Sequence, residues 1–489
     1  MLSPSHAPSY ATVLRTRHAC RTFGAALLGR LSYGMVSLSL MLAVKDATGS
    51  YSVAGAVMAL FGATSVFLSP ARAALIDRYG PRRALPPMGA AYALLLSALA
   101  YATWQPGASG LRLGALAVTA GACTPPLGPV MRTVWSSLVP DRELLQRAYS
   151  LDGVAEELLY VTGPLLVGLL VRFAEPAAGV AVSAALVLVG ASALVSSPAL
   201  RGEGGRPSGA MPLPPSGPSG KRLLGTVGLR HAALVSAGVG LCLGALDLLL
   251  VAFTEERHQG ASVAWVLAAL SAGSAVGGLV YGAVSWRMSS RVRLTALGTA
   301  LGLSSVAAGV SPNVYVLVTV VAAAGLFVAP AITTAYLIAD ESVDAGSRTQ
   351  AGAWVNTALN AGSSGGTAAV GLLVGRLPLT VCFSLAAAPV LLCAACSVRR
   401  SHSAGTDGDV LAVRARHGGV GGRARPAGPA APNSSGRWCA TSGGATVPST
   451  APPERREAAP LPRSGVRSRL KQGAQQATSA EVTSDRTPG

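Results

Sequence analysis

The sequence is poor in charged and aromatic residues. Only 12% of its 489 residues are charged and 5% are aromatic, whereas soluble domains average about 25% charged residues. Hydrophobic residues make up 50% of the chain, and the mean hydropathy is +0.47. So little charge excludes a string of ordinary soluble domains. Many apolar runs reach the roughly 20 residues that cross a bilayer, which predicts a polytopic membrane protein.

The chain also lacks the motifs of ATP-driven and hydrolytic proteins. Gly220-Lys221 is followed by Arg222 rather than Ser or Thr, so it does not form a phosphate-binding P-loop. No H-E-x-x-H, G-x-S-x-G or paired metal-ligand motif occurs in the sequence. Most of the seven cysteines lie in apolar runs and are expected to act as small hydrophobic side chains. We therefore predict no enzyme, no cofactor and no metal site.

The net charge of +18 is expected to reflect basic loops and a basic tail, because no basic patch with interleaved aromatics indicates nucleic-acid binding. Lys and Arg gather in alternate loops, which predicts a multi-pass protein of the plasma membrane with both termini in the cytoplasm. Twelve spans can be drawn. They cover residues 22–44, 52–70, 85–104, 112–131, 148–171, 177–197, 231–253, 262–285, 293–311, 314–338, 350–374 and 378–397.

These spans predict an all-α membrane protein made of two six-helix bundles with a pseudo-two-fold repeat. The second span ends in "ARAALIDRYGPRRAL" and the eighth in "VYGAVSWRMSSRVRL". Aligning Ala73 with Gly282 pairs Arg78 with Arg287, at the same place in each half. The predicted domains are a cytoplasmic segment (1–21), a first bundle (22–197), a flexible linker rich in Pro, Gly and Ser (198–230), a second bundle (231–397) and a disordered basic tail (398–489).

The turn after the second span resembles the cytoplasmic signature of the major facilitator superfamily, approximately G-x-x-x-D-R-x-G-R-R. The match keeps Asp77, Arg78, Gly80 and Arg82, and departs at Ala73 and Pro81. The resemblance covers about residues 15 to 397. It implies two bundles around a central cavity that opens alternately to either side, with this loop as a latch on the inward gate.

Asp77 is expected to be the hub of that latch, because it is the only acid among four cations and can bind guanidinium groups in one state and release them in the other. Arg72 and Arg83, by contrast, are expected mainly to set topology, and Arg132 is counted with the inside cations for the same reason. The predicted gating loop comprises Asp77, Arg78, Gly80, Arg82 and Arg83.

Ionisable residues inside spans are candidates for function, because a charge in the bilayer is costly. Arg30 and Glu156 each lie about 12 Å past the cytoplasmic end of their helix, so they could form an ion pair or bind a proton or substrate. Asp247 is a lone carboxylate that could carry protons or face an aqueous vestibule. The candidates for the cavity or for proton coupling are Arg30, Tyr33, Asp152, Glu156, Glu157, Asp247, Asn356 and Asn360. The two asparagines could line the cavity or bond between helices, and packing is the favoured use.

Span five contains "TGPLLVGLL", which partly resembles the antiporter signature of the same family. Gly163, Pro164 and Gly168 fit that signature, while Leu159 replaces one of its glycines. The span-four arginine of many proton-driven exporters has no good counterpart in the spans as drawn, since Arg112 lies at an outer end.

The sequence thus predicts a secondary active transporter that works by alternating access. It is expected to export a small organic molecule or drug in exchange for protons. Its expected partners are the lipid bilayer, the substrate and protons, without nucleic acid, and the chain is expected to be a monomer. Two alternatives remain open, an importer of the same fold and a non-transporting membrane sensor or scaffold.

Overall fold

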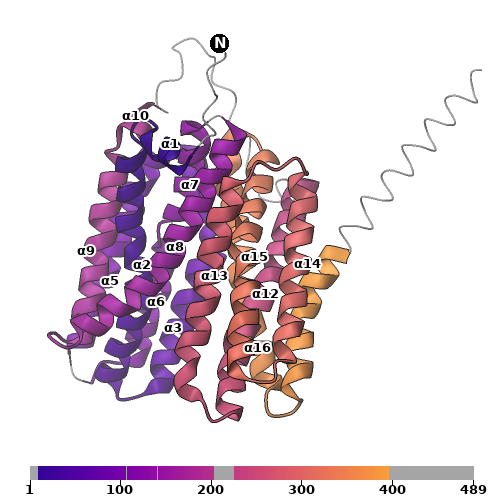
Figure 1. Ribbon diagram of the computed structural model, residues 1–489. Coiled ribbons are helices and arrows are strands. Elements are labelled where there is room, and N and C mark those ends of the chain that lie inside the picture. Colours follow the sequence, from indigo (N-terminus) through magenta and orange to yellow (C-terminus); the bar gives the residue numbers. More distant parts are fainter. Residues whose placement is uncertain (1–8, 106, 140, 203–224, 396–489) are drawn as a thin grey trace, which may run out of the picture. The chain divides into compact units, whose positions relative to one another are not determined.

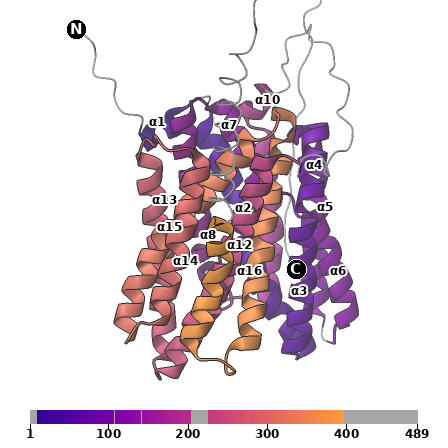
Figure 2. The same cartoon turned by 90° about the vertical axis from the view of Figure 1, so that its right-hand side faces the viewer.

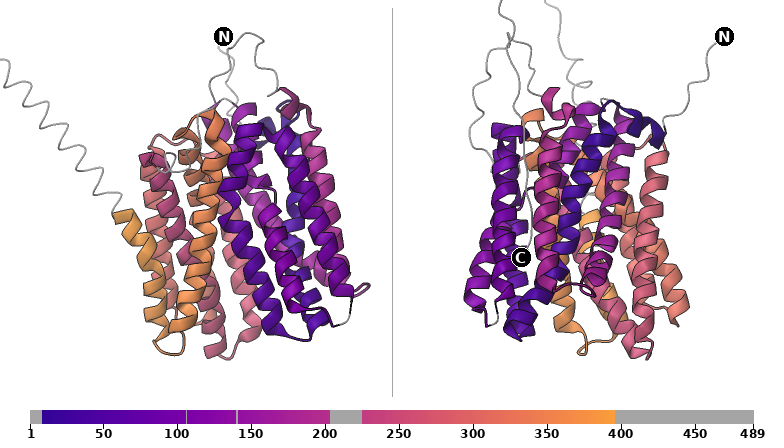
Figure 3. Two further views of the ribbon diagram at one scale, coloured as in Figure 1. Left: turned by 180° about the vertical axis from the view of Figure 1, so that it is seen from behind. Right: turned by 90° about the vertical axis from the view of Figure 1, so that its left-hand side faces the viewer.

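The computed structural model describes residues 9–105, 107–139, 141–202 and 225–395. These residues are almost entirely helical, and the long helices run side by side (Figure 1). The helices of residues 9–202, the first half, lie beside those of residues 225–395, the second half (Figures 1 and 2). The view from behind shows the same arrangement, with indigo-to-purple helices next to salmon-to-orange ones (Figure 3).

The helices of each half follow in chain order. The first half contains α1 (Tyr10–Arg15), α2 (Ala19–Thr48), α3 (Tyr51–Phe67), α4 (Ser69–Tyr79), α5 (Pro81–Trp104), α6 (Gly110–Cys123), α7 (Leu127–Leu138), α8 (Arg142–Leu170), α9 (Pro176–Val195) and α10 (Pro198–Gly202). The second half contains α12 (Val227–Glu256), α13 (Val263–Ala283), α14 (Ser290–Gly309), α15 (Val314–Glu341), α16 (Arg348–Leu373) and a last described helix, Leu379–Ala395.

Within the described residues, nine helices are long and apolar enough to cross a membrane, counting α6 and α7 together as one. The bent pair of α3 and α4 makes a tenth. The more polar α16 and the shorter Leu379–Ala395 complete two sets of six, as the sequence predicts. Large apolar side chains project outward from these helices, as expected for a surface in contact with lipid. Examples that are more than half exposed are Leu94, Tyr101, Leu165, Trp265 and Leu303.

The second and fourth spans are broken helices, and both extend further than the sequence indicated. The second bends by 40° between α3 and α4, and α4 continues to Tyr79. The fourth is interrupted between Cys123 and Leu127, where Pro125 and Pro126 have no backbone N–H to continue the helix. The predicted limits of 52–70 and 112–131 were therefore wrong at their C-terminal ends, because helical structure resumes after each break.

Several predicted non-helical segments also contain helix. The N-terminal segment 1–21 includes α1 and the start of α2, and the predicted linker 198–230 includes α10 and the first turn of α12. Residues 203–224 and the predicted tail 398–489 lie outside the described residues, so the domain limits stay predictions.

Helices α2 and α8 cross in direct backbone contact at two glycines. A Cβ atom on Gly163 would lie 2.4 Å from the carbonyl carbon of Gly34, and one on Gly34 would lie 2.5 Å from the carbonyl oxygen of Leu159. Small residues at such crossings let membrane helices approach closely. Gly163 of the predicted span-five signature is thus a packing residue, and the crossing brings Arg30 of α2 next to α8.

This contact predicts that Gly163→Ala destabilises the protein, because the added methyl group overlaps backbone that cannot move aside. The expected loss is about 1–3 kcal/mol in the free energy of unfolding, measured as a lower melting temperature in detergent. Gly168→Ala on the same helix is the matched control, since its Cβ would meet nothing within 4 Å. Equal melting temperatures for the two variants would contradict the close crossing.

Candidate functional site

Two arginines and two carboxylates form a closed ring of charges inside the first half, here called the charge ring: Arg30, Arg132, Asp152 and Glu156. Arg30 lies 2.7 Å from an Asp152 oxygen and 2.9 Å from a Glu156 oxygen. Arg132 contacts the same carboxylates at 3.2 and 2.6 Å. Asp152 and both arginines are buried, whereas the Glu156 side chain is 28% exposed. The four charges cancel, so the ring buries no net charge, and their mutual attraction offsets part of the cost of desolvation.

Each member of the charge ring is placed by its helix. Asp152 and Glu156 are one turn apart on α8, and Arg30 reaches them from α2 across the Gly34–Gly163 contact. The sequence left an Arg30–Glu156 ion pair open, and the structure contains it. The sequence analysis treated Arg132 only as a cytoplasmic cation, which was wrong. Arg132 lies inside span four because the helix resumes after the prolines. An apolar run that continues past Arg132, with Val134 and Trp135, was the signal that could have shown this.

The charge ring touches the second half through an aromatic residue. The Arg132 guanidinium lies 3.7 Å from the centre of the Tyr336 ring in α15, a cation–π contact. The Tyr336 hydroxyl donates to Asn356 Oδ1 in α16 at 3.3 Å, and Asn360 Nδ2 donates to the Asn356 carbonyl at 2.8 Å. Asn356 therefore bonds between helices, the second of the two uses that the sequence left open.

Two further acids lie near the charge ring but outside it. Ser274 of α13 donates to Glu157 at 3.0 Å. Asp247 is exposed about two-thirds of the way along α12. Glu157 and Asp247 lie within electrostatic reach of each other. In the part of the chain that the structure describes, neither carboxylate has an arginine or lysine partner. Tyr160, one turn beyond Glu156, is 59% exposed.

The carboxylate of Asp77 joins the two halves at the end of the bundle where α4 ends and α16 begins, here called the basic end. Asp77 Oδ2 accepts a hydrogen bond of 2.8 Å from the backbone N–H of Gln350, in the first turn of α16. Ser347, the residue before that helix, makes no side-chain cap of its own. Asp77 thus caps α16 from the other half, where a carboxylate also suits the positive end of the helix dipole.

The expected arginine hub around Asp77 is wrong for the described residues. Arg78 lies over the ring of Tyr79 at 5.3 Å, and Arg82 and Arg83 are exposed. Gly80 has φ +80°, a backbone conformation that favours glycine, and it makes the tight turn between α4 and α5. The turn keeps its arginines in solvent and leaves Asp77 facing α16.

Many other hydrogen bonds close the basic end between the halves. They include Arg348 to Ser136 (3.1 Å) and Gln146 to the Tyr281 carbonyl (2.9 Å). Arg142 also forms an ion pair with Glu341 (2.8 Å). The Tyr10 hydroxyl of α1 donates to the Leu279 carbonyl at 2.5 Å, and burial raises the pKa of Tyr10 to about 12, so it stays protonated. Among the described residues, hydrogen bonds between the halves occur at the basic end or midway along the helices, not at the opposite end.

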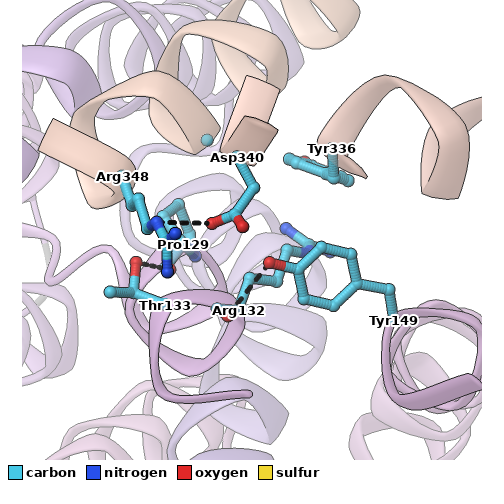
Figure 4. Close-up of a pocket in the computed structure, with 8 residues that line it drawn as sticks. Pro129, Arg132, Thr133, Tyr149, Tyr336, Asp340 and Arg348 are labelled. Carbon is cyan, nitrogen blue, oxygen red and sulfur yellow. Dashed lines mark hydrogen bonds and ion pairs between the residues drawn. The ribbon is translucent and has the colours of Figure 1, made fainter. Parts of the chain in front are cut away.

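A small polar cavity separates the charge ring from the basic end (Figure 4). Its lining includes Arg132, Thr133, Tyr149, Tyr336, Asp340 and Arg348. It is about the size of one water molecule. Asp340 and Arg348 pair at 3.3 Å on its second-half side, and Tyr149 donates to the Arg132 carbonyl at 3.2 Å on its first-half side. The cavity is therefore shared by both halves.

Arg72 is buried inside the first half rather than exposed in a loop. Its side chain donates to the carbonyl oxygens of Ser65 (2.5 Å), Gly121 (2.8 Å), Ala122 (3.1 Å) and Thr64 (3.4 Å). Only 6% of the residue is exposed. The expectation that Arg72 serves topology alone is therefore wrong, because a loop charge needs no such burial.

Among the described residues, no side chain forms a hydrogen bond with either of the two remaining signature residues of span five. Pro164 lies within α8, and Gly168 faces open space. Among the described residues, no group of three or more His, Cys, Asp or Glu side chains is placed to hold a metal ion.

The charge ring predicts a characteristic response to removing one charge. Asp152→Asn leaves a buried net positive charge and should lower the free energy of unfolding by about 3–5 kcal/mol. Adding Arg132→Gln restores neutrality, so the double variant should be more stable than the sum of the two single losses allows. The measurement is a double-mutant cycle on unfolding.

The control for this cycle is Asp46→Asn, which removes one partner of the exposed Lys45–Asp46 pair (3.2 Å). It should change the stability by less than about 1 kcal/mol. Purely additive losses for Asp152→Asn and Arg132→Gln would contradict a coupled ring.

Comparisons with known proteins agree with this architecture. Residues 22–260 match the family model described as "Major Facilitator Superfamily". No curated protein sequence is significantly similar to the chain.

Solved transporter structures share the fold at low sequence identity. The human organic anion transporter MFSD10 (TETRAN) is 18% identical, with a TM-score of 0.61 over 79% of this chain and 99% of that one. A bacterial homologue of the iron transporter ferroportin, in an outward-facing state, is 15% identical, with a TM-score of 0.63 over 79% of this chain and 100% of that one. The chain is therefore similar to the Major Facilitator Superfamily over residues 22–260, and its fold is the one that these solved transporters have.

Proposed function

We propose that the chain exports a small organic molecule in exchange for protons, by alternating access. The observation that carries this proposal is the charge ring, which is held by the first half but touches the second half at Tyr336. A change of charge in the ring therefore acts on the contact between the halves. That is the coupling that a secondary transporter requires.

The side that is closed follows from the distribution of charge. The bias of Lys and Arg supports a cytoplasmic basic end, and with that orientation the Asp77–Gln350 bond and its neighbours close the cytoplasmic side. This corresponds to an outward-facing state, the state in which one of the similar transporters is described. Export then requires these bonds to break in one half-cycle and to form again in the other.

A proton on the charge ring would favour breaking them. With both carboxylates ionised the ring is neutral, and a proton on the partly exposed Glu156 leaves one unbalanced positive charge in a desolvated place. Arg132 then loses a partner and is free to shift against Tyr336. Protonation thus destabilises the closed cytoplasmic side, while loss of the proton restores it.

The remaining acids favour a substrate with a positive or protonatable group. Glu157 and Asp247 come from different halves and have no cationic partner in the described part of the chain. The exposed ring of Tyr160 beside them adds a surface that attracts organic cations. The resemblance of the Gly163–Pro164 segment to an antiporter signature supports export. The similar transporters are described as carrying different cargoes, an organic anion and iron, so they support the mechanism rather than a particular substrate.

Transport in everted membrane vesicles tests this proposal. The host should lack its own multidrug exporters, and the probes are ethidium as an organic cation and fluorescein as an organic anion. We expect ethidium to accumulate when the vesicle interior is acidic, and a protonophore to abolish this. Accumulation only in right-side-out vesicles would favour an importer. No movement of either probe by correctly inserted protein would favour a sensor or scaffold.

Asp247→Asn should reduce the proton-dependent flux of ethidium at least about tenfold, because it removes one of two uncompensated carboxylates that would bind a cation or proton. Glu256→Gln is the matched control, since it removes an exposed acid at the end of the same helix. Unchanged flux in Asp247→Asn would remove this residue from the proposed pathway.

Asp77→Ala should shift the protein towards an open cytoplasmic side, because α16 loses its cap. A cap is worth about 1 kcal/mol, which corresponds to roughly a fivefold higher ratio of open to closed protein. Spin labels on Ser137→Cys and Gly346→Cys can report this ratio as a distance distribution, since both sites are exposed on opposite halves of the basic end. Asp46→Ala, at the other end of α2, should leave the distances unchanged. A distribution in Asp77→Ala equal to that of the unmodified protein would contradict the latch.

A further inference from the structure

The breaks in spans two and four lie against each other and share one cation. Where a membrane helix ends inside the bilayer, its last carbonyl oxygens need new hydrogen-bond donors, because no water is available. The carbonyls at the end of α3 that face this break belong to Thr64 and Ser65, and those at the end of α6 to Gly121 and Ala122. Thr64 and Gly121 each also accept one backbone N–H, from Leu68 and Thr124, whereas among the described residues Ser65 and Ala122 accept no backbone N–H from outside the helices. Arg72, on α4, donates to all four.

A guanidinium is suited to this task in a way that an ammonium is not. It is planar and presents five N–H donors in a fixed fork, so one group can hold carbonyls on two helix ends at once. A lysine carries the same charge as a compact point on a flexible stem. If Arg72 served topology alone, either residue would do, which makes the exchange of the two a sharp test.

Arg72 connects the two functional elements of the first half. Asp77 is five residues further along the same 11-residue helix α4, where it caps α16. Arg132 lies on α7, directly after the break whose α6 side Arg72 holds. The Tyr33 hydroxyl of α2 donates to the Pro125 carbonyl within the same break. The break is thus fixed between α4 and α2, the helix that also carries Arg30.

We propose that Arg72 is a positioning residue that ties α4 to the break between α6 and α7. Displacement of Arg132 from the charge ring is transmitted through the break to α4 and withdraws Asp77 from α16. The latch at the basic end and the charge ring then change state together rather than independently.

The second half makes the same connection at the matching position. The alignment of Ala73 with Gly282 pairs Arg72 with Tyr281. The Tyr281 hydroxyl lies 2.7 Å from Thr334 Oγ1, and the Thr334 hydroxyl donates to the Pro330 carbonyl at 2.7 Å. Span eight is therefore tied to span ten next to a proline, as span two is tied to the carbonyls that precede the prolines of span four. Arg72 and Tyr281 thus hold aligned positions in the two halves and use different kinds of hydrogen bond to connect the corresponding pair of spans. This supports a shared mechanical role for the position.

The test measures the response of the gate to the charge ring, without substrate. The full chain carries the spin-label pair at positions 137 and 346, with its seven native cysteines replaced. Glu156→Gln mimics a protonated ring, and we expect it to raise the ratio of open to closed protein about fivefold. In an Arg72→Lys background the same change should raise the ratio less than about twofold, because the tie is lost. Arg230→Lys, an exposed arginine at the start of α12, is the matched control and should keep the full response.

A full response in Arg72→Lys would overturn the proposal and leave Arg72 a topology residue. If Glu156→Gln alone, in the protein that keeps Arg72, left the ratio of open to closed protein unchanged, this would also overturn the proposal, because there would be no movement to transmit. Should Arg72→Lys fail to fold, Tyr33→Phe removes one hydroxyl from the other side of the same break and should weaken the response in the same direction. An unchanged response in that variant would count against the tie.

The inference rests on the proposed function in one respect, the coupling of ring to gate, and the two can fail separately. A response that depends on Arg72, together with no proton-driven flux in vesicles, would support the tie and reject the proposed transport. Normal flux with a response that ignores Arg72 would do the opposite.

Discussion

The buried ring of Arg30, Arg132, Asp152 and Glu156 is the constraint on which the rest of the first half depends. Four charges in a low-dielectric interior are tolerable only while they remain together, since each one alone would be strongly destabilising. Their assembly requires the close crossing of α2 and α8 at two glycines, and it requires span four to break so that Arg132 turns inward. The glycine contact, the proline break and the carbonyl-bound Arg72 are all conditions for keeping this ring closed.

The contacts that close the basic end are of a different kind, and the difference suits a gate. Arg142 and Glu341 are 63% and 43% exposed, so their pairing contributes at most about 1 kcal/mol. Other bonds run from side chains to backbone carbonyls or amide groups, which water can satisfy when the halves part. Many weak bonds of this sort form a closed state that a single change of charge can open. In the proposed mechanism, the buried ring would sense charge, while the weaker contacts of the basic end would move.

The sequence predicts the architecture better than the site. Hydropathy and loop charge are properties of local segments, so the spans, the two halves and the depth of Arg30 and Glu156 could be derived from them. The roles of Arg132 and Arg72 could not, because each depends on where a helix resumes after prolines and on carbonyls that only the fold brings together. Asp77 was expected to bind arginines that are close to it in the sequence. Its partner in the structure is instead the backbone N–H of Gln350, 273 residues away. Because every residue except proline has a backbone N–H, neither composition nor motif spacing indicates which of these groups will bind a distant side chain.

The two halves share a connection but not its chemistry, and this asymmetry has a consequence for coupling. At the repeat position the first half uses the cation Arg72, whereas the second uses the neutral Tyr281 and Thr334. Where the first half has Asp77, the aligned residue in the second is Trp286, whose indole donates to the Tyr281 carbonyl at 3.1 Å. Neutral hydrogen bonds respond little to a nearby proton, while a charged ring and a charged cap respond strongly. In the proposed mechanism, protonation of the charge ring would therefore change the geometry of the first half, and the second half is the body against which it would move.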